Sequence, residues 1–88
     1  MGKINFSIAI EIPNTISPTI FNLDVVEACR KLKTGEVLYE LREKKLHPNG
    51  ERRSCKGAFV MSGQMLCQDT DGWWHRLTKE HYQKIINS

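Results

Sequence analysis

The first residues of the chain alternate between apolar and polar side chains. From Ile4 to Ile12 every second position is Ile or Phe, and the positions between them carry Asn, Ser, Ala and Glu. A period of two sustained over this length, rich in β-branched side chains, predicts a β-strand with one buried face. Pro13 is expected to end the strand, because proline has no N–H to donate to a sheet.

The pattern becomes helical after the following loop. Ser17 is a suitable N-cap and Pro18 fits the first position of a helix, although Asn22 with Asp24 forms a competing start. In either case the apolar side chains fall on one helical stripe: Phe21, Val25, Ala28, Cys29 and Leu32. The sequence therefore predicts a helix that ends near Gly35.

Two further strands are expected on either side of a polar turn. Residues 36–46 alternate at first and then lose the alternation near Glu43, which predicts a strand that leaves the core or carries a bulge. His47-Pro48-Asn49-Gly50 has the residues that a tight turn requires, and the return strand, 51–61, is apolar only from Cys55 onward. We therefore expect a hairpin whose turn, residues 47–50, projects beyond the core.

The last part of the chain predicts a second hairpin and a helix. Ser62-Gly63-Gln64 is expected to turn before a short strand at residues 65–67, and Asp71-Gly72 predicts a two-residue turn before a strand at 73–77. Thr78 is a good N-cap for a helix over residues 79–87. The predicted fold is therefore α+β: a single compact domain over residues 1–88, with an antiparallel sheet of four to five strands and two short helices packed on one face, in the order β-α-β-β-β-β-α.

Basic side chains concentrate in the middle third of the chain. Residues 30–56 hold nine basic and four acidic side chains, or +5, while the net charge of the whole chain is +3. The last turn of the predicted helix holds three of these basic residues, Arg30, Lys31 and Lys33. The helix dipole stabilises positive charge at this end of a helix, so these residues need no ligand to explain them. Arg42 is expected on a strand face, where Glu40 offsets its charge. The other five basic residues surround the predicted turn, within residues 44–56: Lys44, Lys45, Arg52, Arg53 and Lys56.

Catalytic and metal-binding motifs are not recognisable in the sequence. Cys29, Cys55 and Cys67 do not form a disulfide framework, and together with His75 and His81 they lack the spacing of a zinc site. Phosphate-binding glycine loops are also missing, and we expect the imidazole of His75 to be structural. The sequence thus predicts a non-enzymatic protein without cofactor or metal. The cysteine usage and the lack of a long apolar run indicate a cytoplasmic protein that does not enter a membrane.

The adjacent tryptophans Trp73 and Trp74 must point to opposite faces of their strand, so one indole leaves the core side. The C-terminal helix or a second copy of the chain could cover it. Alternatively, the indole is exposed for a partner, and with Arg76 and the basic hairpin nearby it could stack on a nucleobase.

Two functions fit these features. In the first, the basic side chains around the turn bind nucleic-acid phosphates or an acidic protein surface, with His47 and Asn49 at the tip. In the second, the chain is a protein-interaction or inhibitor module that uses the edge of its N-terminal strand, including as a homodimer. The interface residues of the second function would be Ile4, Phe6, Ile8, Trp73, Trp74 and Arg76. The sequence favours nucleic acid first and an acidic protein surface second. The preference is narrow, because Glu43 and Glu51 reduce the positive charge of the basic patch.

Overall fold

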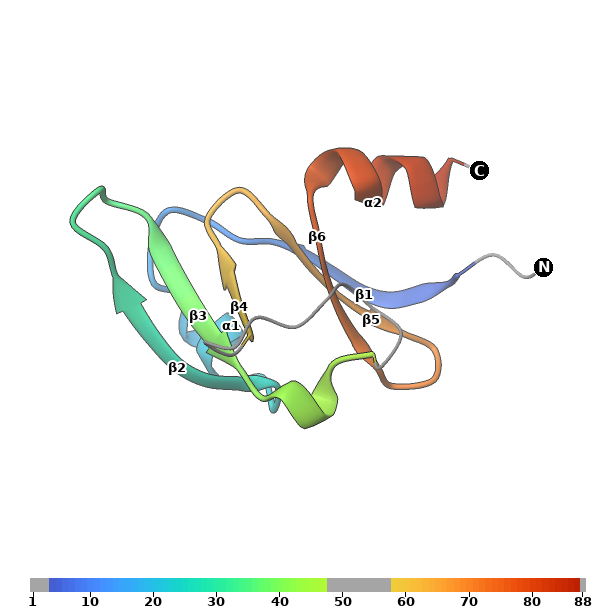
Figure 1. Cartoon of the computed structure of the whole chain (residues 1–88), viewed down its shortest axis with the longest axis horizontal. Coiled ribbons are helices and arrows are strands. Elements are labelled where there is room, and N and C mark those ends of the chain that lie inside the picture. The colour runs from blue at the N-terminus through green and yellow to red at the C-terminus, as the bar shows by residue number, and fades with distance from the viewer. Residues whose placement is uncertain (1–3, 48–57, 88) are drawn as a thin grey trace.

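The computed structural model describes residues 4–47 and 58–87, which form two antiparallel three-stranded sheets (Figure 1). Sheet A has the order β1-β5-β6, with β1 at Phe6–Glu11, β5 at Met65–Asp69 and β6 at Trp74–Leu77. Sheet B has the order β2-β3-β4, with β2 at Val26–Lys31, β3 at Val37–Leu41 and β4 at Ala58–Met61. The α+β class and the antiparallel pairing are confirmed. The expected single sheet of four to five strands is wrong, since the strands divide between two sheets.

The N-terminal strand is confirmed as β1, an outer strand of sheet A. Its side chains alternate between half-buried and exposed along its length. Ile8 and Ile10 pack against the core between the sheets, whereas Phe6 packs against a second cluster on the other face of sheet A. A register shift between Phe6 and Ile8 accounts for this change of face, because a bulge re-aims the side chain next to it.

The long helix predicted after residue 17 is wrong. The helix does begin after Ser17, but it ends at Phe21 as α1 (Pro18–Phe21), and the competing start at Asn22 is not used. The residues that follow form β2, which pairs with β3 from Val26↔Leu41 to Lys31↔Val37. Long-range pairing therefore outweighs a helical stripe that was short and interrupted by β-branched residues.

This correction also changes the role of the basic residues near Gly35. Arg30 and Lys31 lie on the exposed part of β2, and Lys33 lies in the turn between β2 and β3, so none of them is at the C-terminus of a helix. Gly35 ends a hairpin turn: its N–H donates to the carbonyl of Leu32 at 3.0 Å, and its φ is 94°. That backbone conformation favours glycine.

The predicted pairing of the central strands is confirmed, but only near the core. β3 and β4 pair from Leu38↔Met61 to Leu41↔Ala58. Beyond β3 the chain forms a short 3-10 helix, η1 (Glu43–Lys45), instead of continuing as an extended ribbon. Leu46 is then buried and bridges Trp74 of β6. Most of the predicted turn and the first part of the return strand, residues 48–57, lie outside the described residues, so the projecting tip stays a prediction.

The C-terminal hairpin and helix are confirmed in outline. β5 and β6 pair directly, but their loop is Thr70-Asp71-Gly72 and not the expected two-residue turn. The Asp69 N–H donates to the Trp73 carbonyl at 2.9 Å, which closes this loop. The final helix, α2 (Lys79–Ile86), is capped by Thr78, whose Oγ1 accepts a hydrogen bond from the His81 N–H at 3.0 Å.

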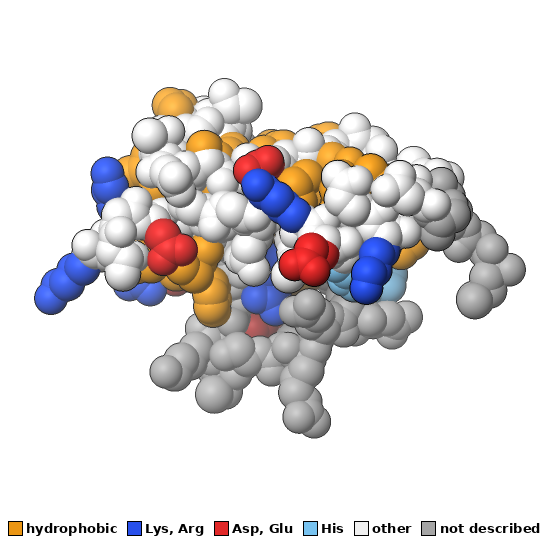
Figure 2. All heavy atoms as spheres, turned by 90° about the horizontal axis from the view of Figure 1, so that it is seen from above, with side chains coloured by type: hydrophobic (Ala, Val, Ile, Leu, Met, Phe, Trp, Pro, Cys, Tyr) orange, Lys and Arg blue, Asp and Glu red, His pale blue; other side chains and the backbone are white. Residues whose placement is uncertain are grey.

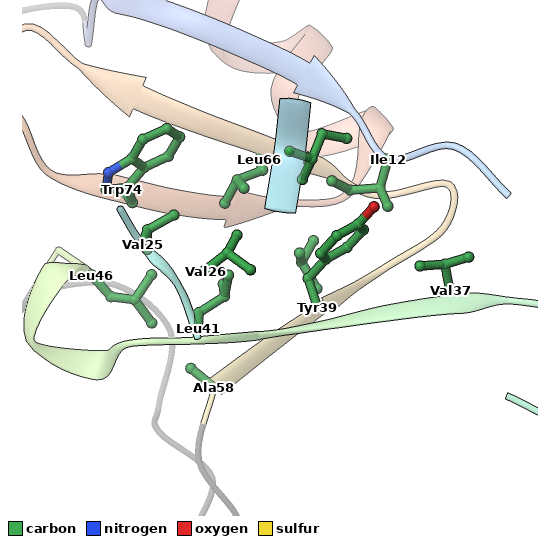
Figure 3. Close-up of a cluster of buried hydrophobic side chains, with 12 residues drawn as sticks. Ile12, Val25, Val26, Val37, Tyr39, Leu41, Leu46, Ala58, Leu66 and Trp74 are labelled. Atoms are coloured by element: carbon green, nitrogen blue, oxygen red, sulfur yellow. The ribbon is translucent and has the colours of Figure 1, made fainter. Parts of the chain in front are cut away.

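The main core lies between the two sheets and includes Tyr39 of sheet B and Leu66 and Trp74 of sheet A (Figure 3). Ile20 of α1 belongs to this same cluster. On the opposite face of sheet A, α2 covers a smaller cluster of Met65, Cys67 and Leu77 with Tyr82 and Ile85. The two helices therefore do not pack on one face, which corrects the predicted arrangement. Among the described residues, no helix is long and apolar enough to cross a membrane.

Candidate functional site

Five rings form a continuous row along one side of sheet A, and we call them the ring row: Tyr82, Phe6, His75, His47 and Trp73. The centroids of Tyr82 and Phe6 are 5.9 Å apart, and those of Phe6 and His75 are 5.6 Å apart. His75 stacks on His47 at 5.0 Å, and His47 meets Trp73 edge to face at 6.1 Å. The row ends at an exposed indole, since 37% of the surface of Trp73 is accessible.

Segments far apart in sequence contribute the central rings. Phe6 comes from the start of β1 and His75 from β6. His47 follows η1, and its N–H donates to the carbonyl of Trp74 at 3.0 Å. The bridge between Leu46 and Trp74 sets this backbone beside β6, because a buried leucine fixes where the segment can run. The three central rings are therefore built on two strands and on a docked segment, while Tyr82 comes from α2 and Trp73 from the loop before β6.

Asp69 forms hydrogen bonds near the Trp73 end of the ring row. Its Oδ1 accepts hydrogen bonds from the Asp71 N–H at 2.9 Å and from the Trp73 N–H at 3.0 Å. Its Oδ2 lies 2.8 Å from Nε2 of His75. The carboxylate therefore holds both the hairpin loop that carries Trp73 and the imidazole in the middle of the row.

The charge of Asp69 is stabilised by these contacts. Burial alone raises the pKa of the carboxyl group, because it disfavours the charged form. The hydrogen bond with His75, the two backbone N–H groups and the charge of His75 act in the opposite direction. Together they outweigh the burial, so the pKa of Asp69 lies below its ordinary value.

An aspartate that orients a histidine is half of a general-base arrangement, but the surroundings of His75 do not complete one. A nucleophile would have to reach the imidazole within hydrogen-bond distance. Within the described residues, His75 hydrogen-bonds Asp69 and contacts the rings of Phe6 and His47, none of which carries a hydroxyl or thiol nucleophile. The thiol of Cys67 lies opposite His75 in β5, but it is fully buried and burial raises its pKa to about 11, which disfavours the nucleophilic thiolate. In the same part of the chain, no group of three or more His, Cys, Asp or Glu side chains could hold a metal ion.

The predicted basic patch is only partly within the described residues. Lys44 is exposed in η1 and forms no ion pair with a described residue, whereas Nζ of Lys45 lies 3.2 Å from Oδ2 of Asp24. The other residues of the predicted patch lie outside the described residues: Asn49, Arg52, Arg53 and Lys56. The structure brings His47 next to Trp73, which the sequence did not connect.

Charges within the described part of the chain balance. Residues 4–47 and 58–87 hold nine basic and nine acidic side chains, so the net charge of +3 comes from Lys3 and from residues 48–57, which hold three basic side chains and one acidic. Arg30 is paired with Glu40 at 3.7 Å and Arg42 with Glu27 at 3.5 Å. In the view from above, basic and acidic side chains are interspersed (Figure 2).

The structure separates the two tryptophans and Arg76. Trp74 is only 2% exposed and lies in the core between the sheets, so Trp73 carries the outward indole. Arg76 is half-buried, and its Nη1 donates to the carbonyl of Phe59 in β4 at 3.0 Å. Arg76 therefore links the two sheets and does not join the ring row.

The predicted interface residues of the N-terminal strand lie in different environments. Ile4 is 42% exposed, Phe6 is half-buried in the ring row, and Ile8 packs against the core. An open groove of about 240 Å³ runs between β1 and α2. The groove is lined by residues of β1, of the segment before it and of α2: Ile4, Asn5, Phe6, Ala9, Tyr82 and Ile86.

Sequence reasoning did not find the roles of Asp69 and Tyr82. Assigning a two-residue turn at Asp71-Gly72 would set His75 opposite Gln68, whereas the observed loop sets it opposite Cys67. A one-residue difference in register moves a side chain to the other face of the sheet. The signal that could have found the site is Asp69 itself, since an aspartate before a loop commonly bonds the backbone N–H two residues later.

Comparisons with known proteins returned no relative: no family model, no curated protein and no solved structure matches this chain.

Proposed function

We propose that this chain is a non-catalytic binding protein whose ligand is single-stranded nucleic acid. A base would stack on the exposed indole of Trp73 at the end of the ring row. Phosphates would meet Lys44 and the basic side chains of residues 48–57. The phosphate contacts of the basic hairpin are those expected from the sequence, and the proposal adds the stacking of a base on Trp73.

The observation that carries the proposal is the position of Trp73. The exposed indole contacts His47, which directly precedes the segment that holds most of the net positive charge. Proteins that bind single strands combine these two elements, because aromatic side chains stack on any base while cationic side chains follow the backbone. The Asp69 hydrogen bonds to the Trp73 loop reduce the entropy lost when a base binds.

A duplex is less favoured than a single strand. The bases of a duplex are stacked on each other, so an indole on a protein surface gains little from them. The whole chain also has a net charge of only +3, which is little positive charge for binding the phosphates of two strands. An acidic protein surface is the second ligand that the same basic side chains could bind, and it would not require the indole.

The test is a fluorescence titration with a labelled single-stranded oligonucleotide, a labelled duplex and an acidic peptide. At about 50 mM salt we expect the single strand to bind best, with an affinity that falls steeply as salt rises. Trp73→Ala should weaken this binding about tenfold or more, since stacking contributes about 1–3 kcal/mol per base. Lys44→Ala should weaken it less and make it less dependent on salt.

Matched variants separate these effects from a general loss of structure. Phe21→Ala removes another exposed aromatic side chain, and Lys84→Ala removes a lysine of α2, and both should bind as the wild type does. The proposal fails if no oligonucleotide binds at low salt, or if Trp73→Ala binds as tightly as Phe21→Ala. Equal binding of the acidic peptide by wild type and Trp73→Ala would support the acidic protein surface instead.

A further inference from the structure

The outer edge of β1 is a second surface that could bind a partner. It does not depend on the nucleic-acid ligand proposed for the ring row. β1 is an outer strand of sheet A, and β5 is its partner on the inner side. Ile12 directs its backbone toward β5, since its N–H donates to the Gln64 carbonyl at 2.9 Å and its carbonyl accepts from the Gly63 N–H at 2.8 Å. Backbone direction alternates along an antiparallel strand, so Ala9 and Glu11 present their N–H and C=O groups outward.

Other outer strands of the two sheets are protected against further pairing. β2 carries the exposed charges of Glu27, Arg30 and Lys31, which oppose the addition of a strand. At β6, the segment at Leu46 and His47 bridges Trp74 and donates to its carbonyl. At β4, the carbonyl of Phe59 accepts from Arg76.

β1 lacks comparable protection in the described part of the chain. Glu11 is the sole charged residue of β1, and its Oε2 lies 2.6 Å from Nζ of Lys79. The groove between β1 and α2 opens beside this strand, with Ala9 and Ile86 in its lining, and Ile86 is 36% exposed. A nearly uncharged outer strand of this kind is a template for another strand.

We propose that two copies of this chain associate by antiparallel pairing of their β1 strands around a two-fold axis at Ala9. The outward groups of Ala9 would then pair with those of Ala9 in the second copy. The two three-stranded sheets A would become one continuous sheet. Symmetric pairing through the same patch on both subunits is the commonest form of oligomer in proteins.

The side chains of β1 favour this register. An axis at Ala9 sets Ile8 opposite Ile10 and Ser7 opposite Glu11, so apolar residues face apolar residues and no like charges meet. An axis at Glu11 would instead set two carboxylates opposite each other. Each copy carries a net charge of only +3, so the repulsion between two copies through net charge is small.

The first measurement is the mass of the protein in solution, by sedimentation or light scattering, over a range of micromolar concentrations. We expect a dimer, and concentration-dependent protection of the Ala9 and Glu11 amide hydrogens against exchange. Ala9→Pro removes an outward N–H while leaving the bonds to β5 in place, and should be a folded monomer. Lys31→Pro makes the same change on the outer side of β2 and should remain a dimer.

A second pair of variants tests the register and covers the case in which Ala9→Pro fails to fold. Ala9→Asp and Ala9→Lys each place like charges at the axis, and each should weaken the dimer about tenfold or more. An equal mixture of the two variants should restore dimers, because opposite charges then face each other. A wild-type monomer at all concentrations, a dimeric Ala9→Pro, or the absence of rescue in the mixture would overturn the proposal. The dimer does not depend on the nucleic-acid site, so Trp73→Ala should remain a dimer even if it no longer binds an oligonucleotide.

Discussion

At the residue scale, Asp69 joins two parts of the candidate site. Its carboxylate accepts from the loop N–H groups of Asp71 and Trp73 and bonds His75. Asp69→Asn keeps an oxygen for the loop but removes the negative charge beside the imidazole. We expect a loss of about 1–3 kcal/mol in the free energy of unfolding near neutral pH, measured by urea denaturation.

The pH dependence of the same variant follows from the lowered pKa of Asp69. At a pH between the pKa of Asp69 in the folded chain and its higher pKa in the unfolded chain, the unfolded chain binds more protons than the folded chain. The stabilisation is therefore fully present above the pKa of the unfolded chain, and it disappears as pH falls through the pKa of the folded chain. Wild type should therefore lose more stability than Asp69→Asn when pH is lowered below about 4. Equal losses in the two proteins would show that the carboxylate is not stabilised by its contacts.

The buried thiol of Cys67 should make the stability of the protein depend on pH in alkaline solution. Burial raises the pKa of its thiol to about 11, against a partly opposing hydrogen bond with the Ile10 backbone. The unfolded chain loses this proton first, so stability is intact below about pH 9 and falls between pH 9 and 11, by about 3 kcal/mol in total. Cys67→Ala should have a smaller alkaline slope in urea denaturation. An unchanged slope would mean that other groups cause it.

At the scale of elements, the success of sequence reasoning depended on how many local signals agreed. β1 has a sustained period of two, and α2 has an explicit cap in Thr78, so both were predicted correctly. Residues 22–32 fit a helical stripe, yet β2 forms because it pairs with β3, which the local sequence does not encode. The C-terminal hairpin was recognised, but its loop has one more residue than expected, so His75 pairs with Cys67 and not with Gln68.

The cap of α2 is a contact that can be removed on its own. Thr78 Oγ1 accepts from the His81 N–H, one of the N–H groups that the helix cannot satisfy internally. Thr78→Ala should lower the free energy of unfolding by about 1 kcal/mol. Thr19→Ala, in α1, changes an exposed threonine without such a bond and should cost less. Thermal unfolding followed by circular dichroism would detect the difference, and equal losses would argue against the cap.

At the scale of the molecule, the sequence predicted the class and the antiparallel pairing but not the division into two sheets. Amphipathic alternation shows that a strand has a buried face and leaves open which other strand covers it. The candidate site shows the same limit. Trp73 and His47 were each noticed as single residues, but their contact depends on how Leu46 docks against β6.

The core between the sheets should make the domain unfold as one unit. Leu66 is fully buried and belongs to a cluster that includes Tyr39 of sheet B and Trp74 of sheet A. Leu66→Ala should therefore cost about 2–5 kcal/mol and weaken both sheets together. Tryptophan fluorescence, dominated by the change at buried Trp74, and far-ultraviolet circular dichroism should give the same unfolding midpoint in wild type and in the variant. Ile16→Ala removes an exposed side chain and should change the stability by about 0.5 kcal/mol or less. Separate midpoints for the two signals would show that the sheets are independent units, because a shared core cannot be lost from one sheet alone.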